Sequence, residues 1–167
     1  QNKNNLGYTV SLGLPALRTK ISKLYGDWYN LDLNPNRIVV TTGSSGAFIL
    51  SFSALFDSGD RVGIGSPSYP SYRQILKSLS LETVDIQTKL QNRFQPVPED
   101  ITNNNLNGIL VASPANPTGS MLDKQSLENL INTANENNVS FISDEIYHGI
   151  QYELSLIHIS EPTRLIT

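Results

Sequence analysis

Residues 108–119 read GILVASPANPTG, a short run of small and apolar residues followed by a polar corner with two prolines. The run 108–112 predicts a buried strand, because a short apolar stretch bounded by turn residues is typical of a strand covered on both faces. We expect this strand to end before Pro114, since proline cannot donate to a strand ladder. The next elements are a predicted helix over 122–131 and a predicted strand over 139–143.

The same alternation of strand and helix extends toward the N-terminus. Hydrophobic periodicity and turn residues predict a helix over 15–25, a strand over 37–42, a helix over 47–55, a strand over 61–64, a helix after Pro70, a strand over 81–86 and a connection over 87–107. Short apolar strands that alternate with helices are typical of βαβ units. The fold class is therefore predicted to be α/β, a three-layer α/β/α sandwich with a mainly parallel sheet.

Composition narrows the classes of function. The chain has 167 residues, 12 basic and 15 acidic side chains, a net charge of −3 and no cysteine. The charge disfavours nucleic-acid binding, and the missing cysteine excludes disulfides and thiolate metal sites, so no metal site is predicted. No apolar run approaches the roughly 20 residues that span a bilayer. We expect a soluble, cytoplasmic protein without a membrane or nucleic-acid partner.

Polar residues follow the predicted strands, at the edge of a parallel sheet where ligands bind. Ser44 and Ser45 follow the first strand in a glycine turn that suits a phosphate, although an ordinary turn with serine caps explains them as well. Tyr69 lies between two prolines, where it could stack on a planar ligand or simply pack. Asn116 offers an amide at a rigid corner, and Asp144 ends the last strand, as a ligand-facing or helix-capping residue.

Two of these segments together resemble a known family. Residues 116–119 (NPTG) and 144–147 (DEIY), separated by one helix and one strand, resemble the motifs of the class I/II, fold-type I aminotransferases, which depend on pyridoxal 5'-phosphate. The loop at Gly43 and the segment 67–70 (PSYP) support the resemblance, which covers about residues 6–153. It implies that residues 1–153 are part of the large cofactor-binding domain of such an enzyme.

The resemblance also implies a role for each candidate residue. Ser44 and Ser45 would hold the cofactor phosphate, and Tyr69 would stack on the pyridine ring. Asn116 and Tyr147 would donate hydrogen bonds to the phenolic oxygen of the ring, and Asp144 would pair with the ring nitrogen. These roles are expected of the site residues Ser44, Ser45, Tyr69, Asn116, Asp144, Tyr147 and Tyr8, of which Tyr8 would reach the phosphate of the neighbouring subunit in a homodimer.

One departure from the family is decisive for activity. The family uses a lysine after the DEIY-type motif to form a Schiff base, and this sequence has no lysine after Lys124. Residues 154–167 do not continue the pattern and resemble translated vector sequence, so we interpret them as a non-native tail. We expect a fragment that lacks the small C-terminal domain and is inactive by itself.

Several functions remain open from the sequence. The parent protein is expected to transfer an amino group between an amino acid and a 2-oxo acid. Alternatives are a carbon–sulfur lyase dependent on the same cofactor and a noncatalytic relative that binds an effector or dimerises. A dinucleotide-binding domain is disfavoured, because residues 43–46 (GSSG) do not have the Gly-x-Gly-x-x-Gly spacing.

Overall fold

The computed structural model describes residues 10–148 and residue 150. The chain divides into two compact units, the first ending at Ala47 and the second beginning at Phe48. Tyr8 and the segment 154–167 lie outside the described residues, so the predictions about them stay predictions. Among the helices of the described segments, none is both long and apolar enough to cross a membrane.

The first unit contains α1 (Pro15–Tyr29) and the short 3₁₀ helix η1 (Pro35–Arg37). α1 confirms the helix predicted over 15–25 and continues to Tyr29, where Asn30 ends it in the left-handed conformation. The buried Arg18 joins the two helices, because its guanidinium donates to the carbonyl of Pro35 at 2.7 and 2.9 Å and to Asn36 Oδ1 at 2.9 Å.

The strand predicted over 37–42 is wrong. The backbone of this segment is extended at Ile38, and Val40 N–H donates to the carbonyl of Leu12 at 3.0 Å, but residues 37–42 pair with no strand within the described part of the chain. β-branched residues favour a strand only where a neighbouring strand offers a ladder and a packed face. One isolated hydrogen bond supplies neither.

The second unit is built on a sheet of four parallel strands: β1 (Arg61–Ser66), β2 (Glu82–Gln87), β3 (Gly108–Ala112) and β4 (Ser140–Asp144). Their order is β2-β1-β3-β4. The register pairs Ile64 with Leu110, and Ala112 with Asp144. These strands confirm the four predicted over 61–64, 81–86, 108–112 and 139–143 to within about two residues at each end, and with them the α/β fold class.

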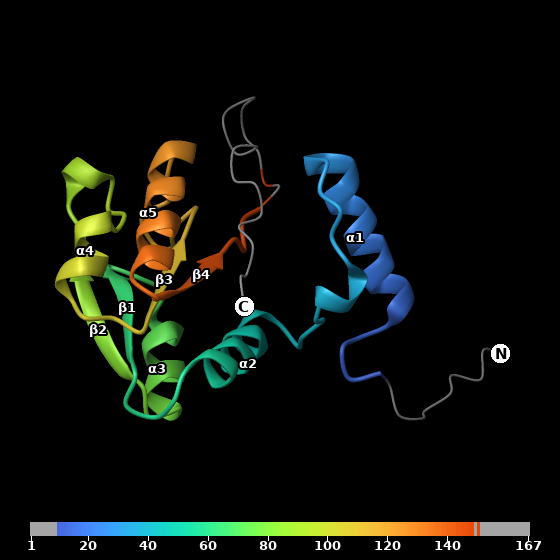
Figure 1. The fold of residues 1–167 in the computed structure, drawn as a ribbon, viewed down its shortest axis with the longest axis horizontal. Coiled ribbons are helices and arrows are strands. Elements are labelled where there is room, and N and C mark those ends of the chain that lie inside the picture. Colours follow the sequence, from blue (N-terminus) through green and yellow to red (C-terminus); the bar gives the residue numbers. More distant parts are fainter. Residues whose placement is uncertain (1–9, 149, 151–167) are drawn as a thin grey trace. The chain divides into compact units, whose positions relative to one another are not determined.

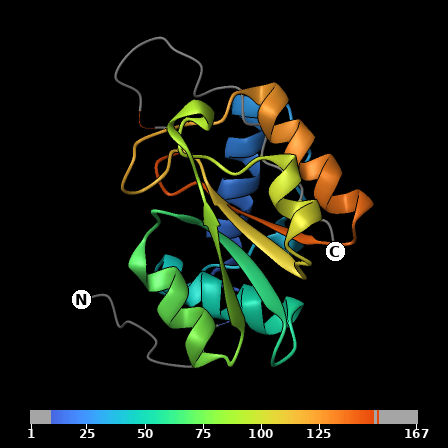
Figure 2. The same cartoon turned by 90° about the vertical axis from the view of Figure 1, so that its left-hand side faces the viewer.

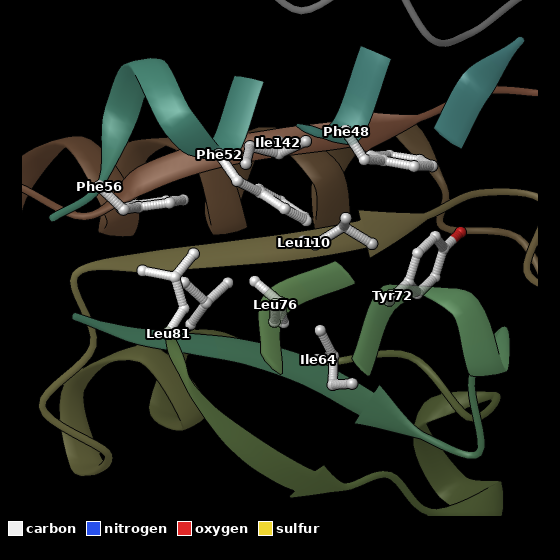
Figure 3. Close-up of a cluster of buried hydrophobic side chains, with 10 residues drawn as sticks. Phe48, Phe52, Phe56, Ile64, Tyr72, Leu76, Leu81, Leu110 and Ile142 are labelled. Atoms are coloured by element: carbon white, nitrogen blue, oxygen red, sulfur yellow. The ribbon is translucent and has the colours of Figure 1, made fainter. Parts of the chain in front are cut away.

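Helices connect the strands and cover both faces of the sheet (Figures 1 and 2). They are α2 (Ser44–Leu55), in which the division between the units falls, α3 (Pro70–Ser78), α4 (Pro98–Asn103) and α5 (Lys124–Glu136). Phe48 and Phe52 of α2 and Phe56, the residue after it, pack with α3 on one face, as Figure 3 shows. Ile101 of α4 and Leu130 of α5 pack on the other face. The predicted three layers are therefore present.

The segment 87–107, expected to be an irregular connection, contains a 3₁₀ helix, η2 (Leu90–Asn92), and the helix α4. α4 begins at Pro98, whose missing N–H costs nothing at a first helical position. The Asp100 carboxylate accepts a hydrogen bond from Val97 N–H at 2.8 Å and so satisfies the helix start. The sequence does not predict this helix, because asparagines surround it and Ile101 is its one buried residue, too few for a hydrophobic periodicity.

A sharp constraint on the sheet comes from Gly108 at the start of β3. A Cβ atom at this position would lie 2.2 Å from Cζ of Phe56. Only glycine allows the phenyl ring of Phe56, the residue after α2, to lie this close to the strand.

Candidate functional site

The connections of the sheet change direction between β1 and β3. From β1 the chain passes through α3 on one face to β2, and from β3 it passes through α5 on the other face to β4. The loops that leave β1 and β3 therefore diverge, and such a divergence at the carboxyl edge of a parallel sheet is the usual place of a ligand site. Tyr69 lies in the first of these loops and Asn116 in the second.

Asp144 is a charged residue at the carboxyl edge of the sheet, on the strand beside β3. It is the last residue of β4 and only 8% exposed. Its Oδ1 accepts a hydrogen bond from Ile146 N–H at 3.1 Å, and its Oδ2 accepts one from the hydroxyl of Tyr72. A buried carboxylate is unfavourable unless donors surround it, and here both oxygens have one. Asp144 is thus a carboxylate that donors hold in place at the end of the strand beside β3.

Tyr72 is the residue that the sequence interpretation missed. It lies in the helix predicted after Pro70 and is only 2% exposed. Its ring makes an edge contact with Phe48 at 5.2 Å between centroids, and its hydroxyl reaches the carboxylate of Asp144 (Figure 3 shows the ring facing Phe48). A buried tyrosine needs a partner for its hydroxyl, which was the available signal.

Burial of the ring raises the pKa of Tyr72 well above its ordinary value, and the hydrogen bond to Asp144 and the negative charge of that carboxylate raise it further. The phenols of Tyr147 and Tyr69 raise this pKa by smaller contributions. Tyr72 therefore keeps its proton and acts as a donor to Asp144.

This pKa predicts how stability depends on pH. Above about pH 10 an unfolded tyrosine loses its proton while folded Tyr72 keeps it, so the free energy of unfolding falls as the pH rises. In urea unfolding of the full-length protein, we expect the wild type to lose about 1.4 kcal/mol more per pH unit in this range than Tyr72→Phe. Tyr69→Phe, a change at a tyrosine that is 36% exposed, is the control and should keep the wild-type slope. Equal slopes for the wild type and Tyr72→Phe would contradict the prediction.

Two further tyrosines lie at this edge. Tyr69 precedes α3 and contacts the ring of Tyr72 edge-on at 5.5 Å between centroids. Tyr147 follows β4 by three residues. Both are 36% exposed, so each presents part of its surface to solvent beside the buried Asp144. Tyr72 thus contacts both Tyr69 and Asp144, and the grouping of Asp144, Tyr69 and Tyr147 in one site stays a prediction.

Asn116 is half-buried in the loop after β3. This loop starts beside Asp144, because Ser113 N–H donates to the Asp144 carbonyl at 3.2 Å. Ser44 and Ser45 are exposed in the first turn of α2, which belongs to the first unit. Gly43 precedes them with a φ of 83°, a left-handed conformation that favours glycine. Their N–H groups are among those that a helix leaves without an internal partner.

Glu145 of the DEIY segment forms a local polar cluster with Ser143 and His148. Glu145 accepts a hydrogen bond from the Ser143 hydroxyl at 2.9 Å, and its other oxygen lies 3.0 Å from Nδ1 of His148. These contacts fix the turn that carries Tyr147 past the end of β4. His148 is therefore tied to the turn through Glu145.

Comparison with known proteins identifies the family of the chain. The family model for aminotransferase class I and II matches residues 1–165. The valine–pyruvate aminotransferase of Mycobacterium tuberculosis is 45% identical over 152 residues, which cover 90% of this chain and 39% of that protein. An aspartate aminotransferase of Thermotoga maritima is 35% identical over 167 residues, 95% of this chain and 44% of that protein.

Solved structures show the same fold. The crystal structure of an aminotransferase from Mycobacterium tuberculosis matches with a TM-score of 0.86 and 45% identity, over 90% of this chain and 42% of that one. A protein of Silicibacter pomeroyi assigned as an aminotransferase matches with a TM-score of 0.82 and 58% identity, over 89% of this chain and 41% of that one. The chain thus spans about two-fifths of the length of these relatives. Since the family model covers nearly all of its residues, the chain belongs to the class I and II aminotransferases.

Proposed function

We propose that the full-length protein containing this chain is an aminotransferase dependent on pyridoxal 5'-phosphate, which transfers an amino group between an amino acid and a 2-oxo acid. The observation that carries the proposal is the buried carboxylate of Asp144 at the carboxyl end of β4, the strand beside β3, held by Tyr72 and by Ile146 N–H. A fixed anion in such a place suits a ligand that presents a positively charged N–H group.

The donor set fits this cofactor. Asp144 would pair with the pyridine nitrogen and hold a proton there, while the exposed face of Tyr69 would stack on the ring. Tyr147 and Asn116 would donate to the phenolic oxygen of the cofactor. When bound, pyridoxal 5'-phosphate withdraws electrons from the α-carbon of the substrate, and a protonated ring nitrogen increases this withdrawal.

The phosphate group has its own candidates. Ser44 and Ser45 offer two hydroxyls and the free N–H groups of the α2 start, a favourable environment for an anion. Tyr8 of a neighbouring subunit would add a further donor in a homodimer. We place residues 1–153 in the large domain of a cytoplasmic enzyme and residues 154–167 outside its native sequence.

The substrates are an amino acid and a 2-oxo acid. Relatives with 45% and 35% identity are named for valine with pyruvate and for aspartate, so the family includes both apolar and acidic substrates. The residues at the described edge contact the cofactor in this proposal, and the side-chain preference would be set elsewhere in the full-length protein.

Covalent attachment of the cofactor tests the proposal. The 167 residues contain no lysine after Lys124, and the family's lysine is expected in the sequence beyond them. We predict that borohydride reduction in the presence of pyridoxal 5'-phosphate adds one cofactor mass to the full-length protein at a single lysine, and none to the 167-residue polypeptide. We likewise expect amino-group transfer by the full-length protein and none by the 167-residue polypeptide.

Circular dichroism on the polypeptide serves as a control, because only a folded polypeptide makes its missing adduct informative. A specific adduct on the 167-residue polypeptide, together with turnover, would show that the chain is self-sufficient. Absence of any adduct or turnover in the full-length protein would instead favour a noncatalytic relative.

A further inference from the structure

Gln95 is a buried polar residue with no place in the roles assigned so far. It is only 2% exposed. Its side-chain amide Nε2 lies 3.1 Å from the carbonyl of Ala112, 3.0 Å from the carbonyl of Ser120 and 3.2 Å from the hydroxyl oxygen of Ser120. One amide group thus donates to both ends of the loop that carries Asn116.

The backbone before Gln95 is strained in a way that supports a specific role. Arg93 and Phe94 have φ values of 53° and 55°, two successive residues with side chains in the left-handed region. This conformation is unfavourable for such residues and persists only where the surrounding structure requires it. Phe94 N–H donates to the carbonyl of Lys89 at 2.9 Å and closes this turn. The turn places the following residue, Gln95, beneath the loop.

The loop has internal hydrogen bonds of its own, including Leu122 N–H to the Ser113 hydroxyl at 3.0 Å and a contact of 2.8 Å between the hydroxyls of Thr118 and Ser120. Ala115 N–H donates to the carbonyl of Ser120 at 2.9 Å, and Gly119 N–H donates to the carbonyl of Ala115 at 2.7 Å. The Ser120 carbonyl is therefore shared between Ala115 and Gln95. Asn116 lies between these anchored positions, so its location depends on how firmly residues 112 and 120 are joined.

We propose that Gln95 is a positioning residue for Asn116: by joining Ala112 to Ser120 it holds the loop in the conformation that presents Asn116 to the cofactor. The proposal rests on the proposed function, in which Asn116 donates to the phenolic oxygen of pyridoxal 5'-phosphate. It predicts that the effect of Gln95 on cofactor binding passes through Asn116.

A double-mutant cycle on the full-length protein tests this coupling. The variants are Gln95→Met, which keeps the length of the side chain without its donors, Asn116→Ala, and the two combined. The dissociation constant for pyridoxal 5'-phosphate is measured on the cofactor-free protein, and the visible absorbance of bound cofactor is followed against pH. We expect each single change to weaken binding about tenfold, and the double variant to bind no more weakly than Asn116→Ala.

The absorbance supplies a signature that a general loss of stability would not produce. Gln95→Met should move the pH midpoint of the absorbance change in the same direction as Asn116→Ala. Gln125→Met is the matched control, because the Gln125 amide also donates a hydrogen bond, to Asn129 Oδ1 at 2.9 Å, but on the exposed face of α5. It should leave both quantities unchanged.

Thermal melting establishes that the variants are folded. If Gln95→Met does not fold, Gln95→Asn, which withdraws the amide by one methylene, replaces it with the same expected result. Independent effects that multiply to about a hundredfold, or unchanged binding in the Gln95 variant while Asn116→Ala weakens it, would overturn the role of Gln95 alone. A wild-type protein that binds no pyridoxal 5'-phosphate would overturn the proposed function, and the role of Gln95 with it.

Discussion

Asp144→Asn is expected to lower kcat/KM for amino-group transfer in the full-length protein by about 10³-fold, the scale observed when a buried, preorganised electrostatic contact is removed. The asparagine side chain has the shape of aspartate, and its carbonyl oxygen can still accept a hydrogen bond. It carries no negative charge, so it cannot hold a proton at the ring nitrogen of the cofactor. The measurement is the steady-state rate with an amino acid and a 2-oxo acid.

The two assays, turnover and borohydride trapping, separate chemistry from cofactor attachment. Asp144→Asn should still acquire one cofactor mass after borohydride reduction, because the covalent bond is made by a lysine elsewhere. Asp85→Asn is the control: Asp85 also lies on a strand and pairs with Arg73, but its side chain is 40% exposed. It should stay within about twofold of the wild type, since an exposed ion pair contributes little. Full activity in Asp144→Asn would exclude a catalytic role for this carboxylate.

The strands of the second unit were predictable because local and tertiary preferences agree there. In β3, a glycine followed by four apolar or small residues gives a strand in isolation, and the same residues are buried on both faces of the sheet. The segment 37–42 has the same local character, yet it forms no strand among the described residues, because strand formation depends on a partner that the local sequence does not encode. α4 shows the opposite failure, since its hydrogen-bonded cap outweighs a weak hydrophobic pattern.

The residues of the candidate site also fall into those whose positions the sequence predicts and those whose contacts it does not. The positions of Tyr69, Asn116 and Asp144 at the carboxyl edge could be predicted, because each lies at or just after the end of a parallel strand and such ends share one edge. The hydrogen bonds of Tyr72 and Gln95 could not, because their partners lie up to 72 and 25 residues away in the chain. Nothing in the sequence near Tyr72 distinguishes a tyrosine that fills the core from one that also donates to a carboxylate. That distinction arises only when α3 packs beside β4.

The same packing predicts the largest effect on stability. Phe52 of α2 is fully buried, and its ring lies 5.9 Å from that of Phe48 and 6.2 Å from that of Phe56, between centroids (Figure 3). Phe52→Ala is expected to lower the free energy of unfolding by about 3–5 kcal/mol, because it removes buried apolar surface and leaves a cavity that a close-packed core cannot fill.

Phe94→Ala is the matched control: that ring is 36% exposed, and the same substitution should lower the free energy of unfolding by about 1 kcal/mol or less. Both values come from urea unfolding of the full-length protein followed by circular dichroism. Since Phe48 also contacts Tyr72, the cavity should weaken cofactor binding as well. Equal losses of unfolding free energy in the two variants would show that the rings of Phe48, Phe52 and Phe56 do not hold α2 against the sheet.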